Sequence, residues 1–197
     1  MSEPRLVIAS NNAGKIREIK AILGARFPSI VSMAEAGLHM DIEETGATFE
    51  ENAILKARAV ALACGGPALA DDSGLAVDAL GGAPGIYSAR YSGGDDQDNN
   101  DKLLREMQGM ADRRARYVCA MALAHPDGMV LTAEGRCEGI IGTEPRGKRG
   151  FGYDPLFLVE GYDGQTMAEL PDEEKNCISH RKRAIEALLD KLEAGEP

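Results

Sequence analysis

The start of the fold is decided by residues 6–24, which read Leu6-Val7-Ile8-Ala9-Ser10-Asn11-Asn12-Ala13-Gly14-Lys15-Ile16-Arg17-Glu18-Ile19-Lys20-Ala21-Ile22-Leu23-Gly24. The apolar run 6–9 predicts a short buried strand, and the polar residues 10–15 predict a loop. Aliphatic residues between Ile16 and Leu23 recur at helical spacing, and Gly24 is a typical helix end. The chain therefore opens as strand, loop and helix, an order typical of α/β proteins.

A second strand is predicted where residues 68–75 read Ala68-Leu69-Ala70-Asp71-Asp72-Ser73-Gly74-Leu75. Before it, Thr48 and Glu51 form a capping box that starts a helix running to about Cys64. The apolar residues 68–70 predict a buried strand that ends on the two aspartates, and residues 75–80 predict another strand. Residues 81–94 hold many glycines and predict a structured loop.

The second half of the chain predicts a long β-hairpin. Residues 115–124 alternate larger with smaller side chains, residues 125–128 form a turn, and residues 129–141 return. A helix at 99–108 precedes the hairpin, and a strand at 155–159, a helical turn at 171–176 and a final helix after Ser179 follow it. We predict an α/β fold with a mixed sheet. Its length allows one domain over residues 1–197, or two lobes that share a site.

The composition is that of a globular protein. Apolar residues make up 44% of the 197 residues and charged residues 27%, which excludes wholesale disorder. No apolar run approaches the roughly 20 residues that cross a membrane. A formal charge of −10 repels the nucleic-acid backbone and anionic lipid, so we expect neither nucleic acid nor a membrane as a partner. A phosphate ligand can still bind at a site that is locally basic or holds a metal. Without an export signal or a Cys-x-x-Cys pair, we expect reduced thiols and a cytoplasmic location.

The first candidate site is the loop before the first helix, formed by Ser10, Asn11, Asn12, Ala13, Gly14 and Lys15. Free backbone N–H groups and the helix dipole favour an anion there, and Lys15 adds a positive charge. It is not a Walker loop, because that motif needs a second glycine and a Ser or Thr where Ile16 stands. The alternative is a polar turn with a surface lysine.

The second candidate site is a set of four acids, Glu43, Glu44, Asp71 and Asp72. Adjacent carboxylates at the end of a buried strand are costly without a counter-charge, and such oxygen ligands suit Mg²⁺. If the strand continues, Asp71 and Asp72 point to opposite sides and one of them faces the site. The alternative is a capped turn with solvated acids. The acidic residues 95, 96 and 98, in contrast, are expected only to complement a helix dipole.

Two further segments could contact a nucleobase. Phe151-Gly152-Tyr153-Asp154 puts two aromatic rings in a loop of a chain that lacks tryptophan, and a base can stack on such a ring. Lys175, His180 and Arg181 form a basic group, and the last two lie in a first helical turn, where cations are unfavourable without an anion or a hydrogen-bonding partner. The alternatives are a core aromatic that closes a turn and an exposed basic stretch.

Together these segments resemble the inosine/xanthosine triphosphate pyrophosphatases, a family that cleans the nucleotide pool. The resemblance rests on seven motifs in order: Ser10-x-Asn12-x-x-Lys15-x-x-Glu18, Glu43-Glu44-Thr45-Gly46, Phe49-x-Glu51-Asn52-Ala53-x-x-Lys56-Ala57, Asp71-Asp72-Ser73-Gly74-Leu75, Gly81-Gly82-x-Pro84-Gly85, Phe151-Gly152-Tyr153-Asp154-Pro155, and Glu174-Lys175-Asn176 with Ser179-His180-Arg181. Ser10 stands where the family more often has Thr, and the hydroxyl is kept.

The resemblance implies a two-lobed α/β fold around a long mixed sheet, with the substrate in a cleft between the lobes. It implies a homodimer and Mg²⁺-dependent hydrolysis of ITP, dITP and XTP to the monophosphate and pyrophosphate. Asp72 is the implied general base and metal ligand, and Glu43 the second metal ligand. The implied substrate contacts are Ser10, Asn11, Asn12, Ala13, Gly14, Lys15, Lys56, Ser73, Phe151, Gly152, Tyr153, Asp154, Lys175, His180 and Arg181.

Two other functions remain open at this point. One is a pyrophosphatase for modified pyrimidine triphosphates, which the Phe151 motif and His180-Arg181 disfavour. The other is a nucleotide-binding module without catalysis, which the presence of Asp72 and Glu43 disfavours.

Overall fold

The computed structural model describes residues 5–24, 26–27 and 29–195. The elements follow in the order β1 (Leu6–Ile8), α1 (Ala13–Leu23), β2 (Ile30–Ser32), α2 (Phe49–Cys64), β3 (Ala68–Val77), the 3₁₀ turns η1 (Asp78–Leu80) and η2 (Gly85–Arg90), α3 (Asp96–Glu106), β4 (Arg114–Ala124), β5 (Val130–Ile141), β6 (Phe157–Val159), α4 (Asp172–Ile178) and α5 (His180–Ala194). The six strands lie in the order β2-β1-β3-β4-β5-β6. β1 runs parallel to β2 and β3, whereas β5 and β6 are antiparallel. The predicted α/β fold with a mixed sheet is confirmed.

The chain divides into two compact units, each with its own core. The first unit comprises residues 1–72, 119–135 and 181–197, and the second comprises 73–118 and 136–180. The long strands β3, β4 and β5 each contribute residues to both units. The assignment of residues 1–197 to a single domain stays a prediction.

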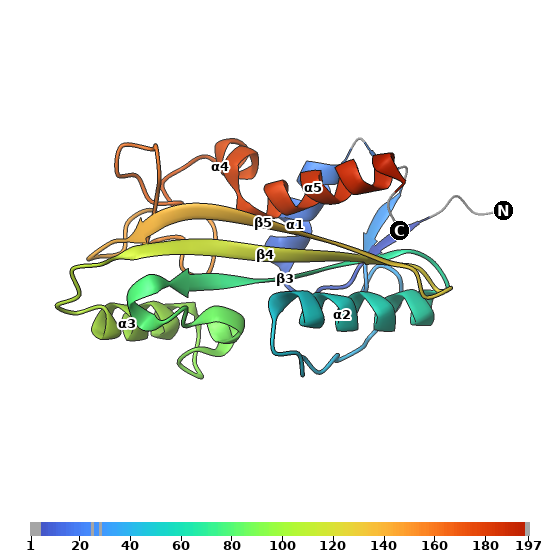
Figure 1. Cartoon of the computed structure of the whole chain (residues 1–197), viewed down its shortest axis with the longest axis horizontal. Helices are drawn as coiled ribbons and strands as arrows, with labels where there is room; N and C mark the ends of the chain where they lie inside the picture. Colours follow the sequence, from blue (N-terminus) through green and yellow to red (C-terminus); the bar gives the residue numbers. More distant parts are fainter. Residues whose placement is uncertain (1–4, 25, 28, 196–197) are drawn as a thin grey trace. The chain divides into compact units, whose positions relative to one another are not determined.

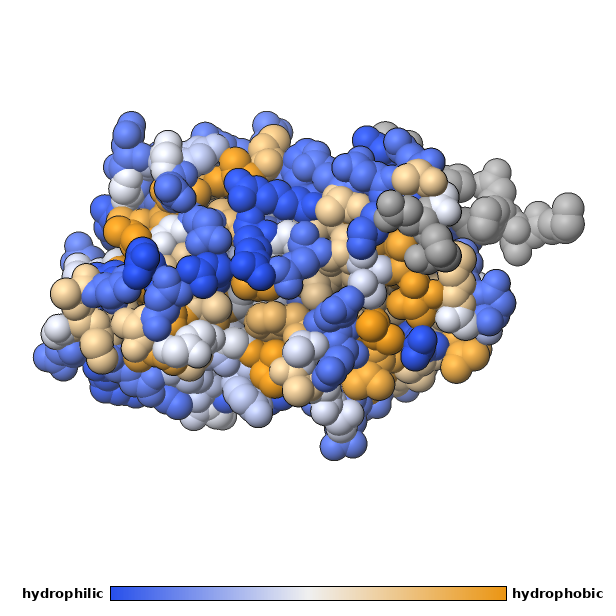
Figure 2. All heavy atoms as spheres, viewed as in Figure 1, coloured by the Kyte–Doolittle hydropathy of each residue, from blue (hydrophilic) through white to orange (hydrophobic). Residues whose placement is uncertain are grey.

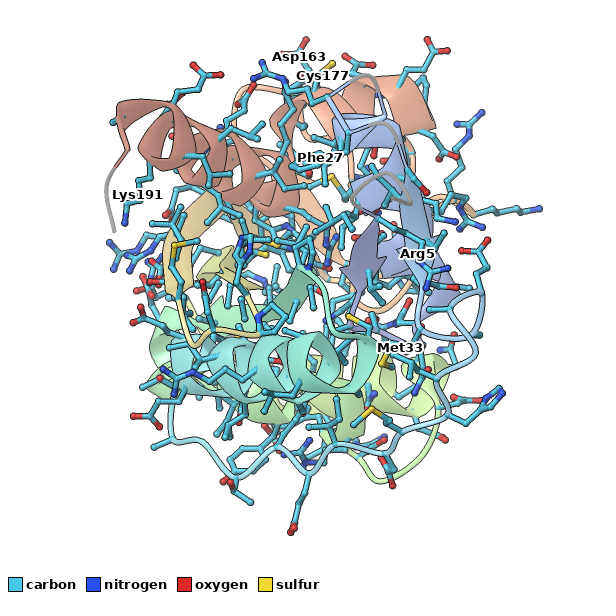
Figure 3. The ribbon with its side chains drawn as sticks, turned by 90° about the vertical axis from the view of Figure 1, so that its right-hand side faces the viewer. Arg5, Phe27, Met33, Asp163, Cys177 and Lys191 are labelled. Atoms are coloured by element: carbon cyan, nitrogen blue, oxygen red, sulfur yellow. The ribbon has the colours of Figure 1, made fainter. Side chains whose placement is uncertain are left out.

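The first unit has three layers, with helices on both faces of its strands (Figure 1). On one face, Ile19 of α1 and Ile185 of α5 pack with Leu6 and Ile8 of β1 and with Leu69 of β3. On the other face lies α2. Figure 3 shows the strands between α5 and α2. Successive strand residues alternate between the two faces, as the two-residue period of a strand requires.

The face that α2 covers is built from alanine. The buried residues there include Ala53, Ala57 and Ala61 of α2 and, on the strands, Ala68, Ala70, Ala120, Ala122 and Ala124. Small side chains on both partners let the helix lie close to the sheet. This close approach brings the polar side chains of the first half of α2 within reach of β3.

The second unit packs α3 on the strands. Leu103 and Met107 share a core with Leu75 and Val77 of β3, and Tyr153 joins them from the loop before β6. α3 begins at Asp96, three residues before the predicted start, because Asp95 and Asp98 form a capping box there. The acidic cluster therefore caps the helix and also supplies its first turn.

One other prediction was wrong, and one strand was not predicted. β3 is one strand over residues 68–77, not two strands that break at Asp71-Asp72. The strand continues because each carboxylate has a cationic partner, so neither has to reach solvent. β2 was not predicted, because its three residues are too few to show a period.

The face of the molecule seen in Figure 2 carries both hydrophilic and hydrophobic residues. Figure 2 shows hydrophilic residues over much of the visible face, with hydrophobic residues scattered among them. The large hydrophobic side chains that are exposed in the described residues are Leu55, Leu62, Tyr87, Met110, Met129 and Ile140. None of the described helices is long and apolar enough to cross a membrane.

The alanine face predicts a stability effect. Ala57→Leu inserts three carbon atoms between α2 and the sheet, and should lower the free energy of unfolding by about 2 kcal/mol. Ala63→Leu, the same change at an exposed position of α2, should stay within about 0.5 kcal/mol of the parent. Urea unfolding followed by circular dichroism measures both, and equal stability of the two variants would contradict the close packing.

Candidate active site

Asp71 lies on the face of β3 that α1 and α5 cover. Its carboxylate is 1% exposed and lies 3.2 Å from the Lys15 ammonium and 3.1 Å from the Arg181 guanidinium. Arg181 also pairs with Glu18, one turn after Lys15 on α1. Burial raises the pKa of Asp71, but the charges of Lys15 and Arg181 outweigh it and hold the pKa below its ordinary value. Asp71 is therefore ionised at neutral pH and pairs there with both cations.

Asp72 lies on the opposite face, toward α2. Its carboxylate accepts hydrogen bonds from the Lys56 ammonium at 3.0 Å and from the Asn52 amide at 3.2 Å. Lys56 also donates to Glu44 at 2.7 Å. Burial raises the pKa of Asp72, and the charge of Lys56 offsets this only in part, so the net shift is upward. The prediction that a continuous strand sends the two aspartates to opposite sides is confirmed. Ser73, the next residue of β3, is half-buried.

In the loop 10–15, side chains of the loop itself accept hydrogen bonds from its backbone N–H groups. Asn12 caps α1, and its side-chain oxygen accepts from the N–H groups of Gly14 at 2.9 Å and Lys15 at 3.1 Å. The Ser10 hydroxyl accepts from the N–H of Asn12 at 3.2 Å. Three backbone donors expected to be open for an anion are thus used within the loop. The Lys15 ammonium is the charge that the loop offers next to Asp71.

The second unit holds a buried carboxylate of its own, Asp154. It accepts from the Lys175 ammonium at 2.7 Å, from the N–H of Phe151 at 2.9 Å and from the Tyr117 hydroxyl at 3.2 Å. The Lys175 nitrogen also lies 4.8 Å from the centre of the Phe151 ring. The structure therefore brings together Phe151, Asp154 and Lys175, which the sequence placed in two separate motifs.

The backbone of Gly152 is held from α3. Its N–H donates to the Asp96 carboxylate at 2.7 Å, and its carbonyl accepts from the Asn100 amide at 2.9 Å. The hydroxyl of the neighbouring Tyr153 donates to the Ser88 carbonyl at 2.8 Å. Asp96 thus fixes the loop in addition to its expected effect on the helix dipole. The loop 151–154 is anchored on both sides and is preorganised.

His180 and Arg181 are neighbours in sequence but have different surroundings. The His180 ring stacks on the Tyr117 ring, with centroids 4.7 Å apart and planes 14° apart. The Arg181 side chain is 1% exposed and ion-paired with Asp71 and Glu18. The contact of Arg181 with a purine base stays a prediction.

The charges of the first unit decide whether a divalent metal fits. In the cluster around the two aspartates, three cations (Lys15, Lys56 and Arg181) face four carboxylates (Glu18, Glu44, Asp71 and Asp72). A triphosphate brings several more negative charges, so it needs a further cation to bind there.

The donors present also fit that cation. Within the described residues, no group of three or more His, Cys, Asp or Glu forms a metal site by itself. Mg²⁺ usually takes one or two carboxylates, waters and substrate phosphates, so a partial site suits it. Glu44 is the acid joined to Asp72 through Lys56, whereas the predicted ligand Glu43 is exposed. The role of Glu43 stays a prediction.

Sequence reasoning missed two residues of the site, Asn100 and Tyr117. Asn100 lies on the same face of α3 as the core residues Leu103 and Met107. An amide on an otherwise apolar helix face could have indicated a buried hydrogen bond. Tyr117 is a buried residue of β4, and the sequence pattern indicated only that it belongs to the core.

The two aspartates should differ in their effect on stability. Asp71→Asn removes the partner of Lys15 and of the buried Arg181, and should lower the free energy of unfolding by about 3 kcal/mol at pH 7. Asp72→Asn should cost much less, because burial already disfavours its charge and Lys56 keeps Glu44.

The pH dependence provides a second measurement. A carboxylate whose pKa is lowered in the folded state stabilises the protein above its unfolded pKa, near 3.8, and loses that contribution as the pH falls. The stability difference between the parent and Asp71→Asn should therefore shrink below pH 3.8. Urea unfolding from pH 7 to 3 tests this, and an unchanged difference would exclude the proposed ion pairs.

Comparison with known proteins places this geometry in a family. The model of the Ham1 family matches residues 6–191. A dITP/XTP pyrophosphatase of Bacillus subtilis (strain 168) is 53% identical over 192 residues, which cover 95% of this chain and 96% of that protein.

Two solved structures are also similar. The Staphylococcus aureus Ham1 protein has a TM-score of 0.85 and 45% identity, covering 98% of this chain and 100% of that one. A HAM1 protein from Coxiella burnetii has a TM-score of 0.87 and 43% identity, covering 97% of this chain and 99% of that one. The match extends over both compact units, so the chain belongs to the Ham1 family.

Proposed function

We propose that this protein is a hydrolase that cleaves non-standard purine nucleoside triphosphates, dITP, ITP and XTP, to the monophosphate and pyrophosphate. The observation that carries the proposal is Asp72, a buried carboxylate with a raised pKa beside the Lys56 ammonium. The Bacillus subtilis relative is a dITP/XTP pyrophosphatase, which supports dITP and XTP as substrates.

Asp72 is suited to activate the attacking water. In the reaction, the water oxygen bonds to the α-phosphorus, a proton passes to the Asp72 carboxylate, and the bond from the α-phosphorus to the bridging oxygen breaks. A raised pKa makes this carboxylate a better proton acceptor than an ordinary aspartate. Asn52 and Lys56 hold its two oxygens in place.

Lys15 and Lys56 are suited to the phosphates. Their ammonium groups can stabilise the charge that develops on the departing pyrophosphate. The residues that would hold Mg²⁺ are Asp72 and Glu43, and the bound ion would offset the charge of the phosphate oxygens. No covalent enzyme intermediate is needed, because water is the nucleophile.

The loop 151–154 and its partners are suited to the base. Phe151 offers a ring for stacking, and Lys175 and His180 carry N–H groups that can bond the C6 keto oxygen of hypoxanthine and xanthine. Adenine presents an amino group there and would leave these donors without an acceptor, so the site should disfavour ATP. The homodimer and the cytoplasmic location that the family resemblance implies are part of the proposal.

The proposed activity is tested with a substrate panel. With Mg²⁺, the protein should release pyrophosphate, not phosphate, from ITP, dITP and XTP, and much less from GTP, ATP and dTTP. Asp72→Asn should lower the rate by a factor on the order of 10²–10⁴ with its circular dichroism unchanged. Turnover of pyrimidine triphosphates instead would support the pyrimidine enzyme, and binding without turnover would support a non-catalytic module.

The phosphate contact of Lys15 has a matched control on the same helix. Lys15→Ala should lower kcat/KM for ITP roughly tenfold, because a charge facing the triphosphate is lost. Lys20→Ala also removes an ion-paired lysine of α1, whose partner is Glu35 at 2.7 Å, and should leave kcat/KM within about twofold. Equal effects of the two changes in steady-state kinetics would show that Lys15 is not a phosphate contact.

A further inference from the structure

Tyr117 contacts two parts of the site through two different parts of its side chain. Its hydroxyl donates to the Asp154 carboxylate at 3.2 Å. The face of its ring stacks on His180, with centroids 4.7 Å apart and an interplanar angle of 14°. Tyr117 belongs to β4, so it is held by the sheet, whereas Asp154 lies in a loop and His180 at the first position of α5.

Asp154 connects the Tyr117 hydroxyl to the loop 151–154 and to Lys175 through hydrogen bonds. One carboxylate oxygen accepts from Tyr117, and the other accepts from the Lys175 ammonium and the N–H of Phe151. The orientation of this carboxylate therefore contributes to the positions of the Lys175 nitrogen and the Phe151 backbone N–H. Asp154 and Lys175 are each 4% exposed, so water has little access to replace a lost donor.

Tyr117 also differs from its neighbours in chemistry. The other inward residues of β4 that flank it, Ala115 and Cys119, are small and have no polar group that must be satisfied. Burial and the carboxylate of Asp154 raise the pKa of Tyr117 well above its ordinary value, so the phenol keeps its proton and stays a donor. A phenylalanine would fill the same volume, and only the hydroxyl reaches Asp154.

We propose that Tyr117 is a positioning residue for base recognition, which orients Lys175 and Phe151 through Asp154 and orients the His180 ring by stacking. This inference rests on the proposed function, because it assigns these groups to a purine base. It makes base selectivity depend on a residue of the sheet that does not itself touch the substrate.

The hydroxyl is tested by Tyr117→Phe, which keeps the ring. The KM for ITP should rise about tenfold while kcat stays within about twofold, because the hydroxyl positions base contacts and not the water at Asp72. The ratio of kcat/KM for ITP over ATP should fall by a similar factor. Tyr117→Leu, which also removes the ring from His180, should lower the ratio further.

Tyr91→Phe is the matched control. The Tyr91 hydroxyl is also bonded to a carboxylate of the second unit, that of Glu106, but neither residue is bonded to Asp154 or stacked on His180 in the described contacts. This variant should keep the KM and the selectivity ratio of the parent. If Tyr117→Phe lowers only the melting temperature, or if Tyr91→Phe changes the ratio equally, Tyr117 is a core residue and the proposal fails.

Binding of IMP, measured by titration calorimetry, separates this inference from the proposed hydrolysis. The parent should bind IMP, and Tyr117→Phe should weaken that binding about tenfold while Tyr91→Phe does not. If the parent binds IMP but does not hydrolyse ITP, the proposed function fails and the positioning role is still tested. Equal IMP affinity of the parent and Tyr117→Phe would overturn the positioning role alone.

Discussion

The burial of two adjacent carboxylates in β3 imposes a charge requirement on every helix of the first unit. A strand sends neighbouring side chains to opposite faces, so each face must supply its own cation or leave a buried charge unpaired. α1 and α5 supply Lys15 and Arg181 on one face, and α2 supplies Lys56 on the other. The register of these helices against the sheet is thus set by charge as well as by apolar packing.

The same arrangement gives the two aspartates different chemistry. Asp71 has two cations on it, and their charge outweighs burial, so its pKa is lowered. Asp72 has one lysine, which it shares with Glu44, and burial prevails, so its pKa is raised. One carboxylate is therefore fixed as an ion that holds the helices, while the other can accept a proton. Two adjacent residues therefore have different roles: Asp71 stabilises the packing of the helices, and Asp72 is the proposed proton acceptor.

Sequence periodicity predicted the opposite faces of the two aspartates, on the condition that the strand continued, but not their different pKa values. The two-residue period places Asp71 and Asp72 on opposite faces only in a strand that continues through them, whereas a capping box was enough to predict the start of α2. The continuity of β3 was not predictable, because it depends on Lys15, Lys56 and Arg181, which lie far away in the sequence. A local sequence pattern shows where a charged residue lies in a strand, whereas its ion-pair partner is determined by how distant segments come together in the fold.

The second unit also buries a carboxylate, Asp154, and surrounds it with hydrogen-bond donors. Asp154 satisfies Lys175, Tyr117 and the backbone of Phe151, and a side chain at Gly150, whose φ is +74°, would collide with this carboxylate. The loop before Phe151 is therefore shaped around one buried carboxylate. Because Asp154 neutralises Lys175, this pair can offer an N–H donor without a net charge. Such a donor suits a neutral purine base, whereas a triphosphate needs positive charge beyond that of the paired lysines of the first unit.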